Sequence, residues 1–285
     1  MSTATFIPEV WSRRLLAALR RAHVYGMVVN RDYEGEISQA GDTVHINSVG
    51  DPTIDDYVPN VTEVEPEEVT TLQQSLLVDQ SKFFAFKVDD VDARQAAGAV
   101  LPQAMENAGF RLRDVSDAFL ELLIRTGVAA GNVLADVTGA AADSTVIYDQ
   151  VLVPLAVLLD ESDVPDEARW AVVPPWVHGH LLRDDRFVSF GTTQNRADLA
   201  NGRIGQAAGF TIHKSNQNPN HTGNLYPVHA GHMSAVTFAE QIPASTTEAY
   251  RPEKGFSDAV KGLHLYGAKV TRPTAVATVD VDRVA

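Results

Sequence analysis

The spacing of apolar residues changes along the chain and predicts a helix, then strands, then a longer helix. Residues 10–24 repeat apolar side chains at helical intervals, with arginines on the other face, which predicts an amphipathic helix. Residues 42–49 alternate polar and apolar side chains as a half-buried strand does, and a second β-rich run covers residues 69–78. These runs predict a two-stranded ribbon with its tip near residues 59–66.

The longest helical pattern follows this ribbon. Asp89 or Asp90 is a candidate cap for a short first segment, which Gly98 and Pro102 interrupt. From Pro102 to Arg125 apolar residues step by three and four, which predicts a helix of about six turns. The stripe comprises Met105, Ala108, Leu112, Val115, Phe119, Leu122 and Leu123.

The second half of the chain alternates helix and strand. Two helices are expected, an apolar one at 147–159 that contains Pro154, and one that begins at Pro174 and Pro175. Strands are predicted at 169–173, 210–213, 225–228, 262–270 and 274–281.

Composition narrows the function classes. The chain has 285 residues, 45% of them hydrophobic, and a formal net charge of −14. This charge argues against a dedicated DNA-binding domain, which normally carries a basic surface. The absence of cysteine excludes disulfides and thiolate metal sites. The sequence shows neither a signal peptide nor an apolar run of about 20 residues, so we expect no membrane partner and folding in the cytosol.

The charges are segregated between the first two regions. No lysine or arginine occurs between Gly41 and Gln80, where nine side chains are acidic. A two-stranded ribbon is marginally stable alone in water, so this ribbon is expected to lie on another, basic surface.

Candidate catalytic motifs are weak. His178 and His180 lie two residues apart, His229 and His232 three apart, and neither pair has the His-Glu-x-x-His spacing of zinc hydrolases. No G-x-S-x-G motif is present, and the glycines within 202–209 fit neither phosphate-binding fingerprint. We therefore expect no enzyme activity, no cofactor and no metal, with a metal-dependent enzyme kept as an alternative.

Several segments, in this order, resemble the major capsid proteins of actinobacteriophages and related tailed phages. They are residues 6–12 (FIPEVWS), 30–36 (NRDYEGE), 41–44, 50–54, 170–175 (WAVVPP), 181–187 (LLRDDRF), 201–205 (NGRIG), 209–210 and 215–216. The resemblance implies the α+β fold that these proteins share with herpesvirus capsids and encapsulins. In this fold an N-terminal arm (1–40) precedes an extended β-hairpin loop (41–80) and a peripheral domain with a long spine helix (81–146). An axial domain (147–250) and strands that return to the peripheral domain (251–285) follow.

The resemblance also implies the function. The subunit would assemble with itself into pentamers and hexamers of an icosahedral virion shell that encloses double-stranded DNA, contacted non-specifically. Assembly would take place in the host bacterial cytoplasm. A separate scaffolding protein is expected because no long scaffolding segment precedes the arm; a portal and a possible decoration protein complete the partners. Some relatives cross-link a loop lysine, but this loop has none, so non-covalent contacts are expected.

Charge segregation suggests which residues meet between subunits. The hypothesis pairs acidic loop residues with arm and spine arginines of a neighbour: Asp55, Asp56, Glu67 and Glu68 with Arg13, Arg14, Arg20, Arg21, Arg111 and Arg113. Besides the metal-dependent enzyme, two alternatives stay open: an encapsulin-like compartment subunit and a minor virion protein such as a portal or decoration subunit.

Overall fold

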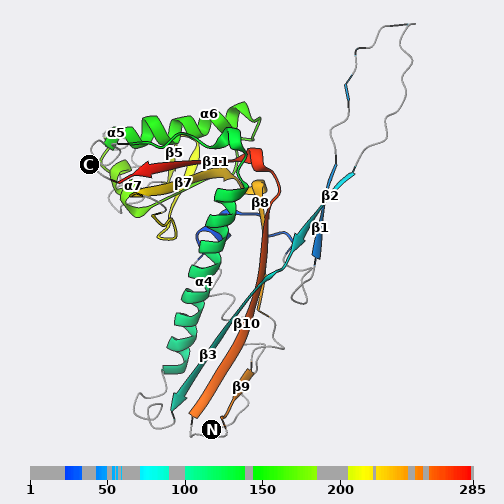
Figure 1. The fold of residues 1–285 in the computed structure, drawn as a ribbon, viewed down its shortest axis with the longest axis vertical. Coiled ribbons are helices and arrows are strands. Elements are labelled where there is room, and N and C mark those ends of the chain that lie inside the picture. The colour runs from blue at the N-terminus through cyan, green and yellow to red at the C-terminus, as the bar shows by residue number, and fades with distance from the viewer. Residues whose placement is uncertain are drawn as a thin grey trace.

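The computed structural model describes most of the chain as two sheets, a long helix and a projecting ribbon (Figure 1). The described residues are 23–33, 43–49, 53–54, 56, 59, 71–89, 100–138, 144–184, 205–220, 223–242, 248–252 and 257–283. The predicted arm helix at 10–24 lies outside these ranges except at its end, which a short helix α2 (Tyr25–Val28) follows.

The predicted ribbon is confirmed. Strands β1 (Thr43–Val49) and β2 (Thr71–Leu77) pair antiparallel, with Thr43 opposite Leu77 and Val49 opposite Thr71. Two residues separate β2 from the next strand, so the ribbon continues directly into the body. Figure 1 shows the ribbon projecting away from the rest of the molecule.

Strand β3 (Gln80–Asp89) is a correction to the sequence analysis, which expected helix from Asp89 onward. Asp89 is the last residue of this strand and caps no helix. The physical reason is an alternation that the cap signal obscured: Phe84 is buried and Phe86 half-buried on one face, while Phe83 and Ala85 are exposed on the other.

The predicted long helix is confirmed as α4 (Val100–Gly127), about 42 Å long at 1.5 Å per residue. Pro102 lies in its first turn, where a missing N–H is tolerated. The buried face differs from the expected stripe, because Val115 and Leu122 are exposed whereas Leu120 and Ile124 are fully buried. The helix is apolar on more than one side.

One sheet lies against α4. Its central strand, β10 (Ser257–Val270), pairs antiparallel with β3 over its first part and with β8 (Val236–Gln241) over its last. The short β9 (Glu248–Tyr250) also pairs with β10. Figure 1 shows α4 and β10 running side by side along the long axis. Between them lies a small core of Phe84, Met105, Leu112, Ile242 and Val260.

The other sheet has the strand order β11-β7-β4-β6-β5. Its strands are β4 (Arg169–Val173), β5 (Gln206–Ala207), β6 (Phe210–Lys214), β7 (Leu225–His232) and β11 (Val276–Asp282). Strands β4 and β6 are parallel, and the remaining pairs are antiparallel. All four sequence predictions in this sheet (169–173, 210–213, 225–228 and 274–281) are confirmed as strands, with shifted ends.

Helices cover this sheet at the top of Figure 1. The helix expected at 147–159 is a continuous run of α5 (Ser144–Val146), a π-helical segment η4 (Ile147–Leu152) and α6 (Val153–Glu161). Pro154 falls in the first turn of α6, where the preceding π turn bonds Val153 N–H to the Tyr148 carbonyl. Helix α7 (Pro175–Leu181) begins at the predicted proline pair.

The tail of the chain divides between the two sheets. Strand β10 belongs to the α4 sheet, whereas β11 pairs with β7 in the other. Short 3₁₀ segments η3 (Ala130–Asn132), η5 (Met233–Ala235) and η7 (Pro273–Ala275) connect the parts. Among the described helices, none combines the length and apolar character that a bilayer crossing requires.

Candidate functional site

Five ionisable residues, buried except for the half-buried Arg31, hold the start of the described chain against α4, β8 and β10. We call them the arm clasp: His23, Arg31, Asp117, Glu240 and His264. His23 donates from Nδ1 to Asp117 Oδ1 at 2.8 Å and from Nε2 to Glu240 Oε2 at 3.3 Å. His264 lies 3.2 Å from the same Glu240 oxygen, and Arg31 donates to the other. The clasp thus joins the arm to α4, β8 and β10.

The clasp holds His23 in its charged form. Burial disfavours the charged ring, but the hydrogen bonds and charges of Asp117 and Glu240 outweigh it and raise the pKa of His23 to about 9. Burial likewise opposes the charge on Glu240, but hydrogen bonds from His23 and His264, with the charges of His23 and Arg31, hold the pKa of Glu240 well below its ordinary value. At neutral pH the clasp is therefore a buried ionic network.

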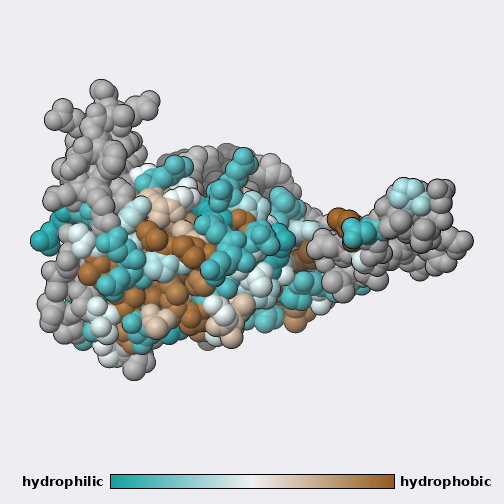
Figure 2. All heavy atoms as spheres, turned by 90° about the horizontal axis from the view of Figure 1, so that it is seen from above, coloured by the Kyte–Doolittle hydropathy of each residue, from teal (hydrophilic) through white to brown (hydrophobic). Residues whose placement is uncertain are grey.

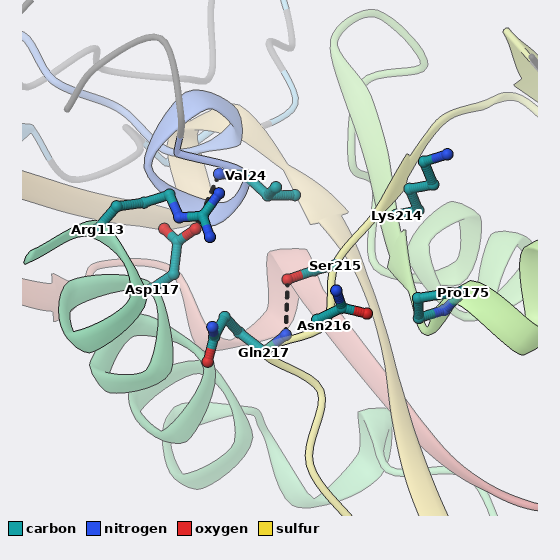
Figure 3. A pocket seen from close by; sticks show the side chains of 8 residues that line it. All are labelled: Val24, Arg113, Asp117, Pro175, Lys214, Ser215, Asn216 and Gln217. Atoms are coloured by element: carbon teal, nitrogen blue, oxygen red, sulfur yellow. Dashed lines mark hydrogen bonds between the residues drawn. The ribbon is translucent and has the colours of Figure 1, made fainter. Parts of the chain in front are cut away.

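Asp117 also fixes the backbone that follows His23. Its carboxylate accepts a hydrogen bond from the Val24 N–H at 2.9 Å (Figure 3) and another from the Gly26 N–H at 3.3 Å. One side chain of α4 therefore sets both the position and the direction in which the arm enters the body.

Two further charged residues follow Asp117 on α4 at intervals of four, and each binds a different element. Glu121 lies 3.3 Å from Nε2 of His229 on β7, and both side chains are buried. Arg125 donates to both carboxylate oxygens of Asp280 on β11, at 2.9 and 2.6 Å. Because residues four apart share a helix face, this row ties α4 to the arm and to the five-stranded sheet in one register.

A polar cavity of about 320 Å³ opens beside the clasp (Figure 3). It lies between α4, the start of α7 and the loop after β6, which meets β4 through the Ser215 N–H and the Val173 carbonyl at 3.0 Å. Its lining residues are Val24, Arg113, Asp117, Pro175, Lys214, Ser215, Asn216 and Gln217. Of the charged residues in this lining, Arg113 is paired with Asp114 and Asp117 is engaged by the arm.

The root of the ribbon packs on the α4 sheet. Ile46, Leu76 and Val78 form a small core with Ala239 and Leu265. Nearby, β10 passes so close that a Cβ on Gly267 would meet the Leu77 carbonyl oxygen at 2.4 Å. The root is thus rigidly seated even though the ribbon beyond it projects from the body.

Comparison with known proteins identifies this arrangement of long helix, two sheets and projecting ribbon. The family model described as phage capsid protein matches residues 73–279, most of the chain. The chain belongs to the phage capsid protein family. No protein of curated function matches the sequence.

Several solved structures have a fold similar to that of the capsid protein. A chain of Mycobacterium phage Che8 shares 31% identity with a TM-score of 0.68, covering 92% of this chain and 91% of that one. The capsid structure of cyanophage P-SCSP1u shares 16% identity with a TM-score of 0.69, covering 92% and 89%. A chain of the holo-SrpI encapsulin complex from Synechococcus elongatus PCC 7942 shares 9% identity with a TM-score of 0.56, covering 93% and 90%.

These likenesses confirm the expected fold class, that of the tailed-phage major capsid proteins. The protein is a subunit of a viral capsid shell, and its family and fold are those of a structural protein. A shell subunit must associate with copies of itself, so its functional surfaces are those it exposes to other subunits.

The described part of the capsid protein exposes apolar side chains on several elements. On α6 the exposed residues are Val153 and Val157, and Figure 2 shows hydrophobic side chains gathered across this end of the molecule. On the long helix, Val115 and Leu122 are exposed. The most exposed are Ile54 in the ribbon, at 93%, and Phe83 on β3, at 80%.

The predicted contact residues divide between described and undescribed parts of the capsid protein. Arg13, Arg14, Arg20, Arg21, Asp55, Glu67 and Glu68 lie outside the described residues. Of the other three, Asp56 and Arg111 are exposed, and Arg113 is half-buried with its Nε 2.9 Å from Asp114. The pairing of acidic loop with arginines thus remains a prediction.

The histidines flagged in the sequence have separate positions. His229 is buried against Glu121, and His232 accepts from the Ser234 N–H at the start of η5. Burial lowers the pKa values of His178 and His180, so both are neutral at pH 7. Within the described ranges, no three histidine, aspartate or glutamate side chains are placed to hold a metal ion.

Sequence reasoning missed the arm clasp. Its residues are far apart in the chain, and no local pattern links them. The available signal was the presence of Asp117 and Glu121 inside a helix that must bury one face, since a buried carboxylate requires a charged or hydrogen-bonding partner.

Proposed function

We propose that this capsid protein assembles into pentamers and hexamers that close an icosahedral shell around double-stranded phage DNA. The observation that carries the proposal is the phage capsid family match over residues 73–279. The projecting ribbon adds to it, because a marginal two-stranded element that points away from its own body is suited to contact a neighbour.

The domain assignment is part of this proposal. The α4 sheet would be the peripheral domain, with α4 as its spine, and the five-stranded sheet the axial domain near the centre of each capsomer. The boundaries inferred from the sequence are 1–40, 41–80, 81–146, 147–250 and 251–285. Sheet membership adds two refinements: β8 and β9 end by residue 250 but pair with β10, and β11 follows residue 251 but pairs with β7.

Heterologous contacts would drive closure, because the same interface must serve both five-fold and six-fold rings. Within this interface the acidic loop would lie over a neighbour and face basic residues of its arm or spine helix. Exposed ion pairs contribute about 0–1 kcal/mol each, so charge would set the register while buried apolar area supplies most of the affinity.

Charge reversal tests the loop contact. Changing Asp55, Asp56, Glu67 and Glu68 to lysine should abolish shells while the isolated subunit melts at an unchanged temperature. Normal shells from this variant would exclude the acidic loop from assembly.

The remaining partners follow from the same proposal. A separate scaffolding protein, a portal and possibly a decoration protein would act during assembly in the host bacterial cytoplasm. The net charge of −14 suits a wall that contacts packaged DNA weakly and non-specifically.

Negative-stain electron microscopy of the purified protein, with size-exclusion chromatography, tests the assembly proposal. Closed shells, tubes or capsomer rings are expected, alone or after co-expression with the scaffold. A protein that stays monomeric in both cases would refute it. The encapsulin-like alternative shares the fold, so nucleic acid and cargo protein should be assayed inside purified shells; enzyme cargo in place of DNA would favour that alternative.

A further inference from the structure

Residues 23–31, here called the strap, connect the two sheets. At one end Asn30 pairs with β8 of the α4 sheet through two backbone hydrogen bonds of 2.9 Å each. Nearer the other end, the Tyr25 hydroxyl donates to Asn218 Oδ1 at 3.0 Å, in the loop that follows β6 of the five-stranded sheet. The strap therefore holds both sheets at once.

The strap also closes the main hydrophobic core. Tyr25, Val28 and Val29 are buried in the core that α4 and both sheets share, and Val29 is only 1% exposed. Burial of these side chains favours the closed strap at every pH. Lifting the strap would expose them to water, so its opening can be detected at a buried position such as Val29.

A single imidazole ring fixes the start of the strap. His23 uses both of its nitrogens, since Nδ1 lies 2.8 Å from Asp117 on α4 and Nε2 lies 3.3 Å from Glu240 on β8. The ring and both carboxylates are buried. Only a protonated imidazole has two N–H groups, so a neutral ring would turn a lone pair toward one of these carboxylates. The closed strap therefore depends on the proton of His23.

The other charged and titratable groups at this place do not replace that proton. Arg31 of the strap already donates to the second oxygen of Glu240. His264 on β10 lies 3.2 Å from the Glu240 oxygen that His23 uses. The Nδ1 atom of His264 has no hydrogen-bond partner among the described residues, so a neutral ring that donates from Nε2 fits this site. Loss of the His23 proton would then leave one buried negative charge without a partner.

Gly26 brings the strap directly over the ring. A Cβ at this position would lie 2.9 Å from Cγ of His23, so the close approach requires a glycine. The Gly26 N–H also donates to Asp117, which ties the same turn of chain to α4. Because the strap itself covers the ring, the state of the strap and the protonation of His23 are coupled.

We propose that the strap is an alkali-sensitive latch, in which loss of the His23 proton releases residues 23–31 as a unit while α4 and both sheets stay folded. Burial lowers the pKa of His23, but the hydrogen bonds and charges of Asp117 and Glu240 outweigh burial and raise it to about 9. The strap is therefore held most firmly below pH 6.5 and loosens progressively up to about pH 9. Acidification leaves the ring protonated and does not open this latch. The inference does not rest on the proposed assembly.

A thiol placed in the strap measures its opening, because the chain has no native cysteine. Val29→Cys puts the probe in the strap, and Val228→Cys puts a matched probe on β7, where the parent side chain is 0% exposed. The full-length protein is labelled with a low concentration of iodoacetamide, and each rate is divided by that of a free cysteine peptide at the same pH. The normalised rate at position 29 should rise about fifty-fold from pH 7 to pH 9.5, as follows from pKa values of about 9 when closed and 6.5 when open.

The comparison of the two positions separates strap opening from unfolding of the subunit. Unfolding exposes both thiols equally, whereas strap opening exposes only the one at position 29, which should therefore react faster at every pH. Equal normalised rates at the two positions would show that the strap does not open alone. Such a result, or a rate at position 29 that does not change with pH, would overturn the proposal.

His23→Gln in the Val29→Cys chain tests the cause. Glutamine cannot carry the charge, so the normalised rate should already be high at pH 7 and should no longer rise with pH. His213→Gln is the control, because this histidine lies on β6 outside the arm clasp, and the full rise should remain. A rise that persists in His23→Gln would assign the pH dependence to another group and refute the latch. If His23→Gln does not fold, the pH profiles of the two thiol positions still decide.

These measurements are independent of shell formation. Failure of the protein to assemble would refute the proposed function and leave the latch intact. Normal assembly with a strap that opens only on unfolding would do the reverse.

Discussion

Replacing His23 by glutamine should remove a pH dependence that the arm clasp imposes on the stability of the subunit. The folded-state pKa of His23 is about 9, against 6.5 for a free histidine. Between these values the folded protein keeps a proton that the unfolded chain has released, so the free energy of unfolding must fall as pH rises.

The magnitude follows from the size of this shift. Each unit of pKa difference corresponds to about 1.36 kcal/mol, so the protonated ring contributes about 3 kcal/mol, present in full below pH 6.5 and lost by about pH 9. About 2 kcal/mol of this should be lost between pH 6.5 and 8. Tyr25 and Tyr266 also have raised pKa values, but their effect on stability begins only above about pH 10.

Urea unfolding of the unassembled subunit, followed by tryptophan fluorescence at several pH values from 6.5 to 9, measures this effect. His23→Gln should be less stable than the parent at pH 6.5 and should approach it near pH 9. His213→Gln is the matched control, because burial lowers the pKa of His213 and its titration therefore cannot make the folded protein less stable as pH rises. Parallel pH profiles for the parent and His23→Gln would refute the reasoning.

Two other substitutions test packing at the ribbon root and on α4. Gly267→Val should destabilise the subunit by about 1–3 kcal/mol and speed proteolysis of the ribbon, because its Cβ would lie 2.4 Å from the Leu77 carbonyl oxygen. In the control Gly131→Ala the new Cβ has no atom within 4 Å, so neither the stability nor the proteolysis rate should change. Arg125→Met should cost about 1 kcal/mol in urea unfolding, since it leaves the half-buried Asp280 carboxylate without its bidentate partner; restoration by Asp280→Asn in the same chain would support this cause, and a neutral single variant would contradict it.

The sequence predicted those helices and strands that are specified by residues close together in the chain. The ribbon strands, α4 and the helix that starts at the proline pair were found because periodicity and proline geometry act over a few residues. Strand β3 was missed because Asp89 and Asp90 look like a helix cap, although Phe83 and Phe84 already pointed to opposite faces. Two consecutive aspartates are a clearer sign of a helix start than a short alternation of apolar residues is of a strand.

Features that depend on contacts between distant residues could not be predicted from the sequence. Val115 and Leu122 fit the apolar stripe of α4 as well as Leu120 and Ile124 do, and only the position of the two sheets selects which pair is buried. The arm clasp is a similar case, since 94 residues separate His23 from Asp117 and 217 separate it from Glu240. No periodicity within a window of helix length carries such information.

The charged row on α4 stabilises the subunit through contacts within one chain. The row of Asp117, Glu121 and Arg125 is engaged within one chain, so its loss should unfold or loosen the subunit before any contact between subunits forms. Ile54 and Phe83 are almost fully exposed, so their loss should leave the free energy of unfolding of the isolated subunit unchanged within about 0.5 kcal/mol. A subunit whose stabilising contacts lie within one chain can fold before it meets a neighbour.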